Sequence, residues 1–241
     1  MQYKRILKYM LFFLLLLSLG FIYSFSLKTN KNLKVSELVV EFEKGDNNFL
    51  THDNVNKLLI QKTDTLQNNT KSVIDLYKLE NKVLMNPYVE KASVFLTIDG
   101  VIKSKIKQRT PVARIINKGD SFYVDKEGVK VPLSENYSAR VLLISGINKQ
   151  LEIDTIMSLL HKIRKDDFLK KEIVGIEKSA LNEYSFAVRS GDYKIDFGNL
   201  DDMEVKFKKM KAFYNKGFSD NSIHNYKRIN VKYHNQVVCT K

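Results

Sequence analysis

The residues that could carry chemistry are few in this 241-residue chain, and their spacing does not combine them into an active site. Two pairs of adjacent carboxylates, Asp166-Asp167 and Asp201-Asp202, could serve as a general acid and base. Both pairs lie next to predicted helix ends, where capping or a solvated surface is the more common role of aspartate. Asp125 stands between a predicted strand and a turn, and we expect it to cap that turn. The pattern therefore favours structural roles for these acids.

Nucleophilic and metal chemistry have equally little support. The single cysteine, Cys239, excludes an internal disulfide framework and a thiolate metal site. The sequence places no histidine to activate this cysteine, and it contains no phosphate-binding loop, G-x-S-x-G elbow or dinucleotide fingerprint. The four histidines have none of the spacings that build a metal site; they are His52, His161, His224 and His234. We therefore expect no catalytic residue, no metal and no cofactor.

The longest uncharged stretch of the chain covers residues 9–27. A helix over it is about 28 Å long, close to the ~30 Å thickness of a bilayer core. Residues 1–8 carry three cations and no acid, which favours a cytoplasmic N-terminus. A cleaved signal peptide is the alternative, but its apolar region usually has about 7–15 residues and ends in a small-x-small site. The sequence predicts a cytoplasmic tail over 1–8 and an uncleaved transmembrane helix over 9–27.

The chain is strongly basic, with a net charge of +13. Most of its cations are lysines spread along the sequence, whereas specific readout of nucleic acid relies on arginine. A lysine-rich surface that faces anionic lipid or polymer is therefore favoured over a nucleic-acid site. A hydrophobic content of 44% and only three prolines indicate folded domains rather than long linkers.

Residues 33–108 have the order strand, helix, helix, strand, strand. A strand over 35–42 precedes a helix that begins at Leu50-Thr51-His52-Asp53, and a polar loop is predicted over 63–72. The second helix should end at Asn86, because the following proline disfavours the helical conformation in the residue before it. This order predicts a small α+β domain.

The last two strands of this region flank Asp99-Gly100. A two-residue turn would place Leu96 opposite Lys103 and mix apolar and charged side chains on one face. A three-residue loop with Gly100 in the left-handed region pairs Leu96 with Ile102 instead. We therefore expect the odd-length loop.

Residues 109–241 have the pattern of short strands interrupted by helices. Strands are predicted over 112–116, 122–124, 129–133, 141–144, 173–176, 184–188, 193–197 and 229–233, and helices over 153–163 and 203–213. In the last strand Ile229, Val231 and Tyr233 share one face. The first two are expected in the core, and Tyr233 suits either the core or a contact. The fold class is α+β: an N-terminal transmembrane helix, a small βααββ domain, and a mixed β-sheet domain with flanking helices.

Several short strings of this chain occur in the order typical of one family. They are Asn86-Pro87-Tyr88-Val89, Gln108-Arg109-Thr110-Pro111-Val112-Ala113, Phe122-Tyr123-Val124-Asp125-Lys126-Glu127-Gly128, Leu143-Ile144-Ser145-Gly146 and the tail Arg228-Ile229-Asn230-Val231-Lys232-Tyr233. With them, residues 6–241 resemble the FtsQ/DivIB family of bitopic bacterial cell-division proteins. Departures from the family pattern preserve shape more than charge; among them are Gln108 for Glu, Asn230 for Asp and Lys232 for Arg.

The resemblance implies a POTRA domain over 33–108 and an FtsQ-type β-domain over 109–241, on the periplasmic side of the bacterial inner membrane at the division septum. It implies a non-catalytic scaffold that binds FtsB- and FtsL-like division proteins and takes no nucleic acid or small-molecule substrate. In this family a partner adds a strand to the edge of the second domain. By motif match, the edge contacts fall on Tyr233, His234, Asn235, Val237 and Thr240.

Two other functions stay open at this point. POTRA units also occur in chaperone and transport components of the envelope, which carry several copies or a large C-terminal barrel, whereas one copy is recognised here. The other is a membrane-anchored enzyme that acts on wall polymer, and the absence of an acid–base pair speaks against it. A pull-down from membranes with the tail strand intact and altered would discriminate among these functions.

Overall fold

The computed structural model describes residues 2–32, 35–45, 49–60, 74–117, 119–219 and 223–241. The chain divides into two compact units, one of Met1–Asp46 with Leu50–Gln108 and one of Asn47–Phe49 with Arg109–Lys241. Each unit has a hydrophobic core of its own. The predicted loop over 63–72 lies outside the described residues.

The first helix, α1 (Gln2–Asn32), contains the predicted apolar run and extends beyond it at both ends. Its segment Ile6–Thr29 has 24 residues, none of which is buried. Such a segment is about 36 Å long, enough to cross a bilayer core of ~30 Å. Among the described residues it is the one helix long and apolar enough for a membrane span, which fits a single-pass membrane protein.

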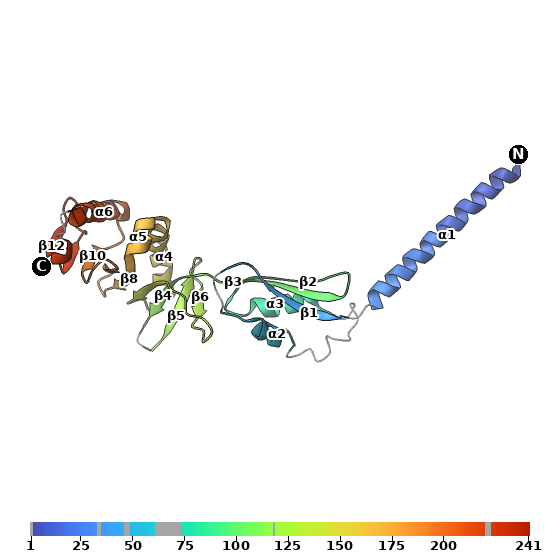
Figure 1. Ribbon diagram of the computed structural model, residues 1–241, viewed down its shortest axis with the longest axis horizontal. Coiled ribbons are helices and arrows are strands. Elements are labelled where there is room, and N and C mark those ends of the chain that lie inside the picture. Colours follow the sequence, from blue (N-terminus) through green and yellow to red (C-terminus); the bar gives the residue numbers. More distant parts are fainter. Residues whose placement is uncertain (1, 33–34, 46–48, 61–73, 118, 220–222) are drawn as a thin grey trace. The chain divides into compact units, whose positions relative to one another are not determined.

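The first unit is built on a three-stranded sheet in the order β1–β3–β2. Its strands are β1 (Glu37–Phe42), β2 (Val89–Leu96) and β3 (Val101–Gln108). The strand β3 pairs parallel with β1 and antiparallel with β2. Both helices, α2 (His52–Ile60) and α3 (Leu76–Leu84), lie on one side of this sheet (Figure 1). The predicted order of strand, helix, helix, strand, strand is confirmed.

The hairpin of β2 and β3 has the expected odd-length turn. Leu96 pairs with Ile102, and Gly100 has a φ of 86°. The N–H of Gly100 donates to the carbonyl of Thr97 at 3.2 Å, and the N–H of Thr97 donates to Val101 at 2.9 Å. Glycine adopts a positive φ without strain. The resulting register places Ile102 in the core, where it is fully buried.

The second unit is built on a nine-stranded mixed sheet in the order β12–β11–β10–β9–β8–β7–β4–β5–β6. Its strands are β4 (Pro111–Ile116), β5 (Ser121–Asp125), β6 (Lys130–Pro132), β7 (Leu142–Ser145), β8 (Ile173–Lys178), β9 (Tyr184–Val188), β10 (Lys194–Gly198), β11 (Arg228–Asn230) and β12 (Val238–Thr240). The pairs β4–β7, β7–β8 and β10–β11 are parallel, and the other neighbours are antiparallel. The predicted mixed sheet is confirmed.

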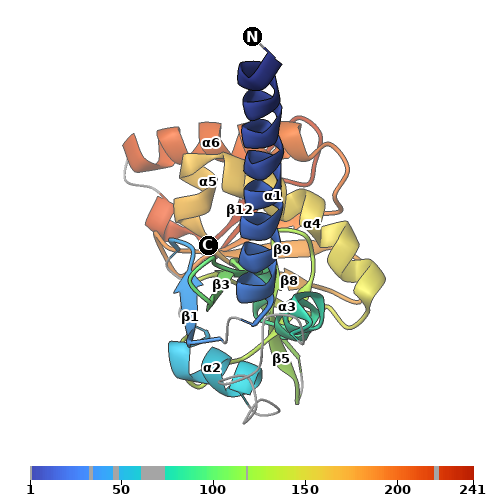
Figure 2. The same ribbon diagram turned by 90° about the vertical axis from the view of Figure 1, so that its right-hand side faces the viewer.

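Helices cover one face of the large sheet. They are α4 (Gln150–Lys165), α5 (Asp167–Glu172) and α6 (Met203–Ser219), and both views show them on the same side of the strands (Figure 1, Figure 2). Buried side chains of α4 and α6 join the strands in one core, among them Ile156 and Met210. On the strands, by contrast, Leu143 and Ile116 keep 46% and 40% of their surface exposed. The short helices α5 and Ile223–Asn225 were not predicted.

Candidate functional site

The end of the chain differs from the prediction in a way that moves the candidate docking edge. The strand predicted over 229–233 ends at Asn230, and the chain returns as β12, antiparallel to β11. In the strand order β12 is terminal and β11 lies between β12 and β10. The prediction of an edge strand that ends at Tyr233 is therefore wrong: β11 is internal, and the C-terminal edge of the sheet is Val238–Thr240.

Asn230 gives the local reason for the end of β11. The N–H of Val231 still donates to the carbonyl of Asp196 in β10 at 3.0 Å, which continues the parallel pairing by one bond. The N–H of Lys232 instead donates to Asn230 Oδ1 at 3.0 Å. An asparagine side chain that accepts from the N–H two residues later forms a turn in place of the ladder. The side chain at 230 therefore directs the chain away from β10.

Lys209 of α6 fixes this turn from the helical side. Its ammonium donates to the carbonyl of Val231 at 2.7 Å and also to the carbonyl of Tyr233. Burial lowers the pKa of Lys209 from its usual value. Two backbone acceptors that a longer strand would use for pairing are thus bound by one side chain, so the segment after Val231 is held in a defined turn.

The predicted contact residues lie along this turn and the edge strand. Tyr233 has 46% of its surface exposed, and His234 and Asn235 are also exposed. Val237 is half-buried and packs against the core, and Thr240 lies exposed in β12. The structure thus brings the five residues into one segment at the edge, although not into a single strand. Their role as contacts stays a prediction.

The other residues of this segment divide into core and surface as expected. Ile229 and Val231 are fully buried, which agrees with the predicted core role. Cys239 lies opposite Ile229 in the ladder, is half-buried and packs against the same core. Burial raises the pKa of the Cys239 thiol, and a thiol with a raised pKa is a poor nucleophile at neutral pH. The geometry therefore gives Cys239 a packing role.

At β11 and β12, the sheet face without helices carries an ion pair that the sequence did not indicate. The opposite residues Arg228 and Thr240 point to the same face, as do Asn230 and Val238. Arg228 donates to both carboxylate oxygens of Asp196 in β10, at 2.9 and 2.6 Å. The carboxylate raises the pKa of the Arg228 guanidinium above its usual value. The pair ties β11 to β10, whereas β12 (Val238–Thr240) contains no charged residue.

Two of the acids considered above, Asp166 and Asp125, serve as caps. Asp166 accepts from the N–H groups of Phe168 and Leu169, both at 3.1 Å, at the start of α5. Asp125 is buried and accepts from the N–H groups of Glu127 and Val129 at 2.9 Å each. Both predicted capping roles are confirmed.

The second oxygen of Asp125 bonds Arg109 at 2.6 Å, a pairing that was not predicted. Three or more metal-ligating side chains do not gather anywhere in the described part of the chain. The best-supported candidate site is therefore the edge of the large sheet rather than a pair of acids.

Two family models match the chain. Residues 110–240 match the model described as FtsQ/DivIB, C-terminal related, and residues 36–107 match that of a POTRA-like domain. The first match covers more than half of the chain and spans the large sheet with its edge strand. No curated protein matches the chain significantly.

Proposed function

Since the chain belongs to the FtsQ/DivIB family, we propose that it receives an FtsB- or FtsL-like division protein as an added strand on β12. Proteins of this family are non-catalytic scaffolds associated with the divisome, and their partners are other divisome proteins. The proposed contacts are Tyr233, His234, Asn235, Val237 and Thr240, together with the backbone of Val238–Thr240.

The observation that carries the proposal is the terminal position of β12 in the sheet order. A strand at the end of a sheet has backbone N–H and C=O groups on its outer side without a strand to pair with, so it can template another chain. Backbone hydrogen bonds then supply affinity, and alternate side chains supply specificity. Val238 and Thr240 are exposed and share a face, so they are available for this second role.

The proposed setting follows from the N-terminal helix. We place residues 1–8 in the cytoplasm, the helix across the bacterial inner membrane and the domains over 33–108 and 109–241 in the periplasm at the division septum. The charge-free run and its basic N-terminal flank support this orientation. In this arrangement the scaffold presents the edge strand to partners outside the cytoplasm.

A pair of proline variants tests the docking edge. Successive backbone N–H groups of a strand point to opposite sides, so Val238→Pro and Cys239→Pro remove donors of opposite direction. One variant loses a bond to β11 and should melt at a lower temperature. The other loses only an outward donor, which an edge strand tolerates. The stable variant should fail to retain the purified FtsB-like protein of the same bacterium.

The melting temperatures of the two variants show which proline faces outward, because only the variant that loses a bond to β11 is destabilised. Binding is measured with the full-length chain in nanodiscs, and both variants are compared with wild type. Unchanged affinity in the stable proline variant would contradict strand addition at β12. Loss of binding in the destabilised variant alone would contradict it too, because that outcome reports only the fold.

A further inference from the structure

A second candidate site lies several strands away from β12, where interior strands of the large sheet begin or end. The parallel strands β4, β7 and β8 begin side by side there, and β9, which is antiparallel to β8, ends beside them. The residues at these strand ends therefore gather with the C-terminal part of α4 and with α5. Together they line a cleft of about 370 Å³ that lies wholly in the second unit.

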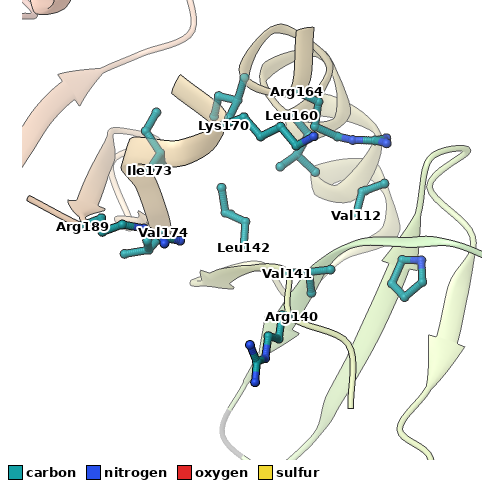
Figure 3. Close-up of a pocket in the computed structure, with 12 residues that line it drawn as sticks. Val112, Arg140, Val141, Leu142, Leu160, Arg164, Lys170, Ile173, Val174 and Arg189 are labelled. Carbon is teal, nitrogen blue, oxygen red and sulfur yellow. The ribbon is translucent and has the colours of Figure 1, made fainter. Parts of the chain in front are cut away.

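The lining of this cleft combines an apolar floor with four cations. The floor includes Val112 and Leu142 from the strands and Leu160 from α4. The cations are Arg140, Arg164, Lys170 and Arg189 (Figure 3), and no acid is among the described residues that line the cleft. All four cationic residues are exposed. An apolar floor with a basic rim suits a ligand that carries both apolar and anionic groups.

The arginine content of the cleft sets it apart from the rest of the surface. The sequence has seven arginines among its 40 cations, and three of the seven line this cleft. The planar guanidinium binds carboxylate or phosphate through two parallel hydrogen bonds, which an ammonium cannot do. Elsewhere Arg109 and Arg228 form ion pairs with aspartates. Within the described residues, none of the cleft cations forms a salt bridge.

Two of the three acids of the adjoining α5 segment are engaged elsewhere. Asp166 caps α5 and binds Lys211. Glu172 is buried and accepts from Tyr214 at 3.0 Å and from Ser190. Neither of these two carboxylates is therefore available to neutralise the cleft, and the third acid, Asp167, is not among the residues that line it.

The positions of the cations around the cleft favour a ligand with several separate negative charges. Figure 3 shows Arg164 and Lys170 on the helical side of the cleft and Arg140 on the opposite side, with Leu142 pointing into the space between. Cations presented from different sides match several carboxylates better than a single phosphate group. We propose that this cleft binds an acidic peptide segment of a protein partner, with an apolar side chain on the floor and flanking carboxylates on the arginines.

This site is independent of the docking edge, and a defined probe tests it. The probe is a fluorescein-labelled hexapeptide with two central leucines and two glutamates on each side. Its binding to the full-length chain in phosphatidylcholine nanodiscs is followed by fluorescence polarisation. Arg164→Gln/Arg189→Gln removes two charged donors and should weaken binding at least about tenfold.

The matched control, Lys208→Gln/Lys216→Gln, removes the same charge from exposed positions of α6 that do not line the cleft. This control variant should bind the probe as wild type does, and both variants should keep the wild-type melting temperature. Equal weakening in both variants overturns the proposal, because it assigns the effect to overall charge. Absence of saturable binding to wild type also overturns it. If inorganic phosphate displaces the peptide at concentrations at or below the peptide's own Kd, the cleft is a phosphate site. That result overturns the peptide assignment.

Discussion

The two ends of the large sheet expose strands of equal length and different chemistry. Both β6 (Lys130–Pro132) and β12 (Val238–Thr240) have three residues. In β6, Pro132 has no N–H to offer and Lys130 adds an exposed charge, two features that protect a sheet edge from further pairing. The strand β12 has neither proline nor charge. One edge is therefore blocked by its sequence, and the other is left open.

The two edge strands also differ in how the core holds them. Val131 of β6 is fully buried. The central residue of β12, Cys239, is only half-buried, and its neighbours on both sides are exposed. The strand β12 thus depends more on its ladder with β11 and on the turn that leads into it. Segments with few buried contacts open more readily than segments anchored in the core, so we expect an added strand to protect β12.

The largest effect is expected beneath the open edge. Ile229→Ala truncates a fully buried side chain of β11 and should lower the free energy of unfolding by about 2–5 kcal/mol. Tyr233→Ala changes a half-exposed side chain in the turn. This variant should change the free energy of unfolding by only about 0.5 kcal/mol, and it should weaken partner binding. Urea unfolding measures the stability of each variant, and a binding titration measures its affinity for the partner. Similar destabilisation by the two variants would place Tyr233 in the core.

The turn before β12 should respond to a change on α6. Lys209→Met removes the ammonium that binds the carbonyls of Val231 and Tyr233. Loss of this charged donor should lower the free energy of unfolding by about 1–3 kcal/mol and weaken partner binding, although Lys209 is not a proposed contact. Lys211→Met is the matched control, since its partner is the Asp166 cap of α5. A normal affinity in Lys209→Met would show that the turn does not position the edge.

The smallest effect is expected at the blocked edge. Pro132→Val gives β6 a backbone donor at its outer side, with little change in stability, about 0.5 kcal/mol. The variant should self-associate more than wild type as its concentration rises, because an unblocked edge can pair with a second copy. Sedimentation velocity measures this association. Increased capture of the FtsB-like partner by this variant would mean that any open edge suffices and that β12 has no special role.

The parts of the fold with local causes could be predicted from the sequence. The turn at Gly100 followed from the conflict between Leu96 and Lys103, and Asp125 and Asp166 were expected at caps from their positions. The pattern predicts one strand over 229–233 and does not distinguish the short β12 from the residues that follow that strand. The run Val237-Val238-Cys239-Thr240 is rich in β-branched residues, which is the signal that could have separated it.

The geometry of the candidate site depends on contacts between distant residues, which local patterns do not encode. Lys209 binds carbonyls 22 and 24 positions later in the chain, and nothing around Lys209 in the sequence marks it. Asp196 and Arg228 are 32 positions apart, and they meet because β10 and β11 pair in parallel. The family resemblance indicated the C-terminal segment, whereas the turn that shapes it required the structure.

Amide hydrogen exchange of β12 with and without the purified FtsB-like partner tests the central claim most directly. An added strand bonds only the outward N–H groups, because the alternate groups already face β11. We expect partner binding to increase protection at alternate amides among Val238, Cys239 and Thr240, and to leave Lys130 and Val131 of β6 unchanged. Saturating partner without new protection in β12 would contradict docking at this edge.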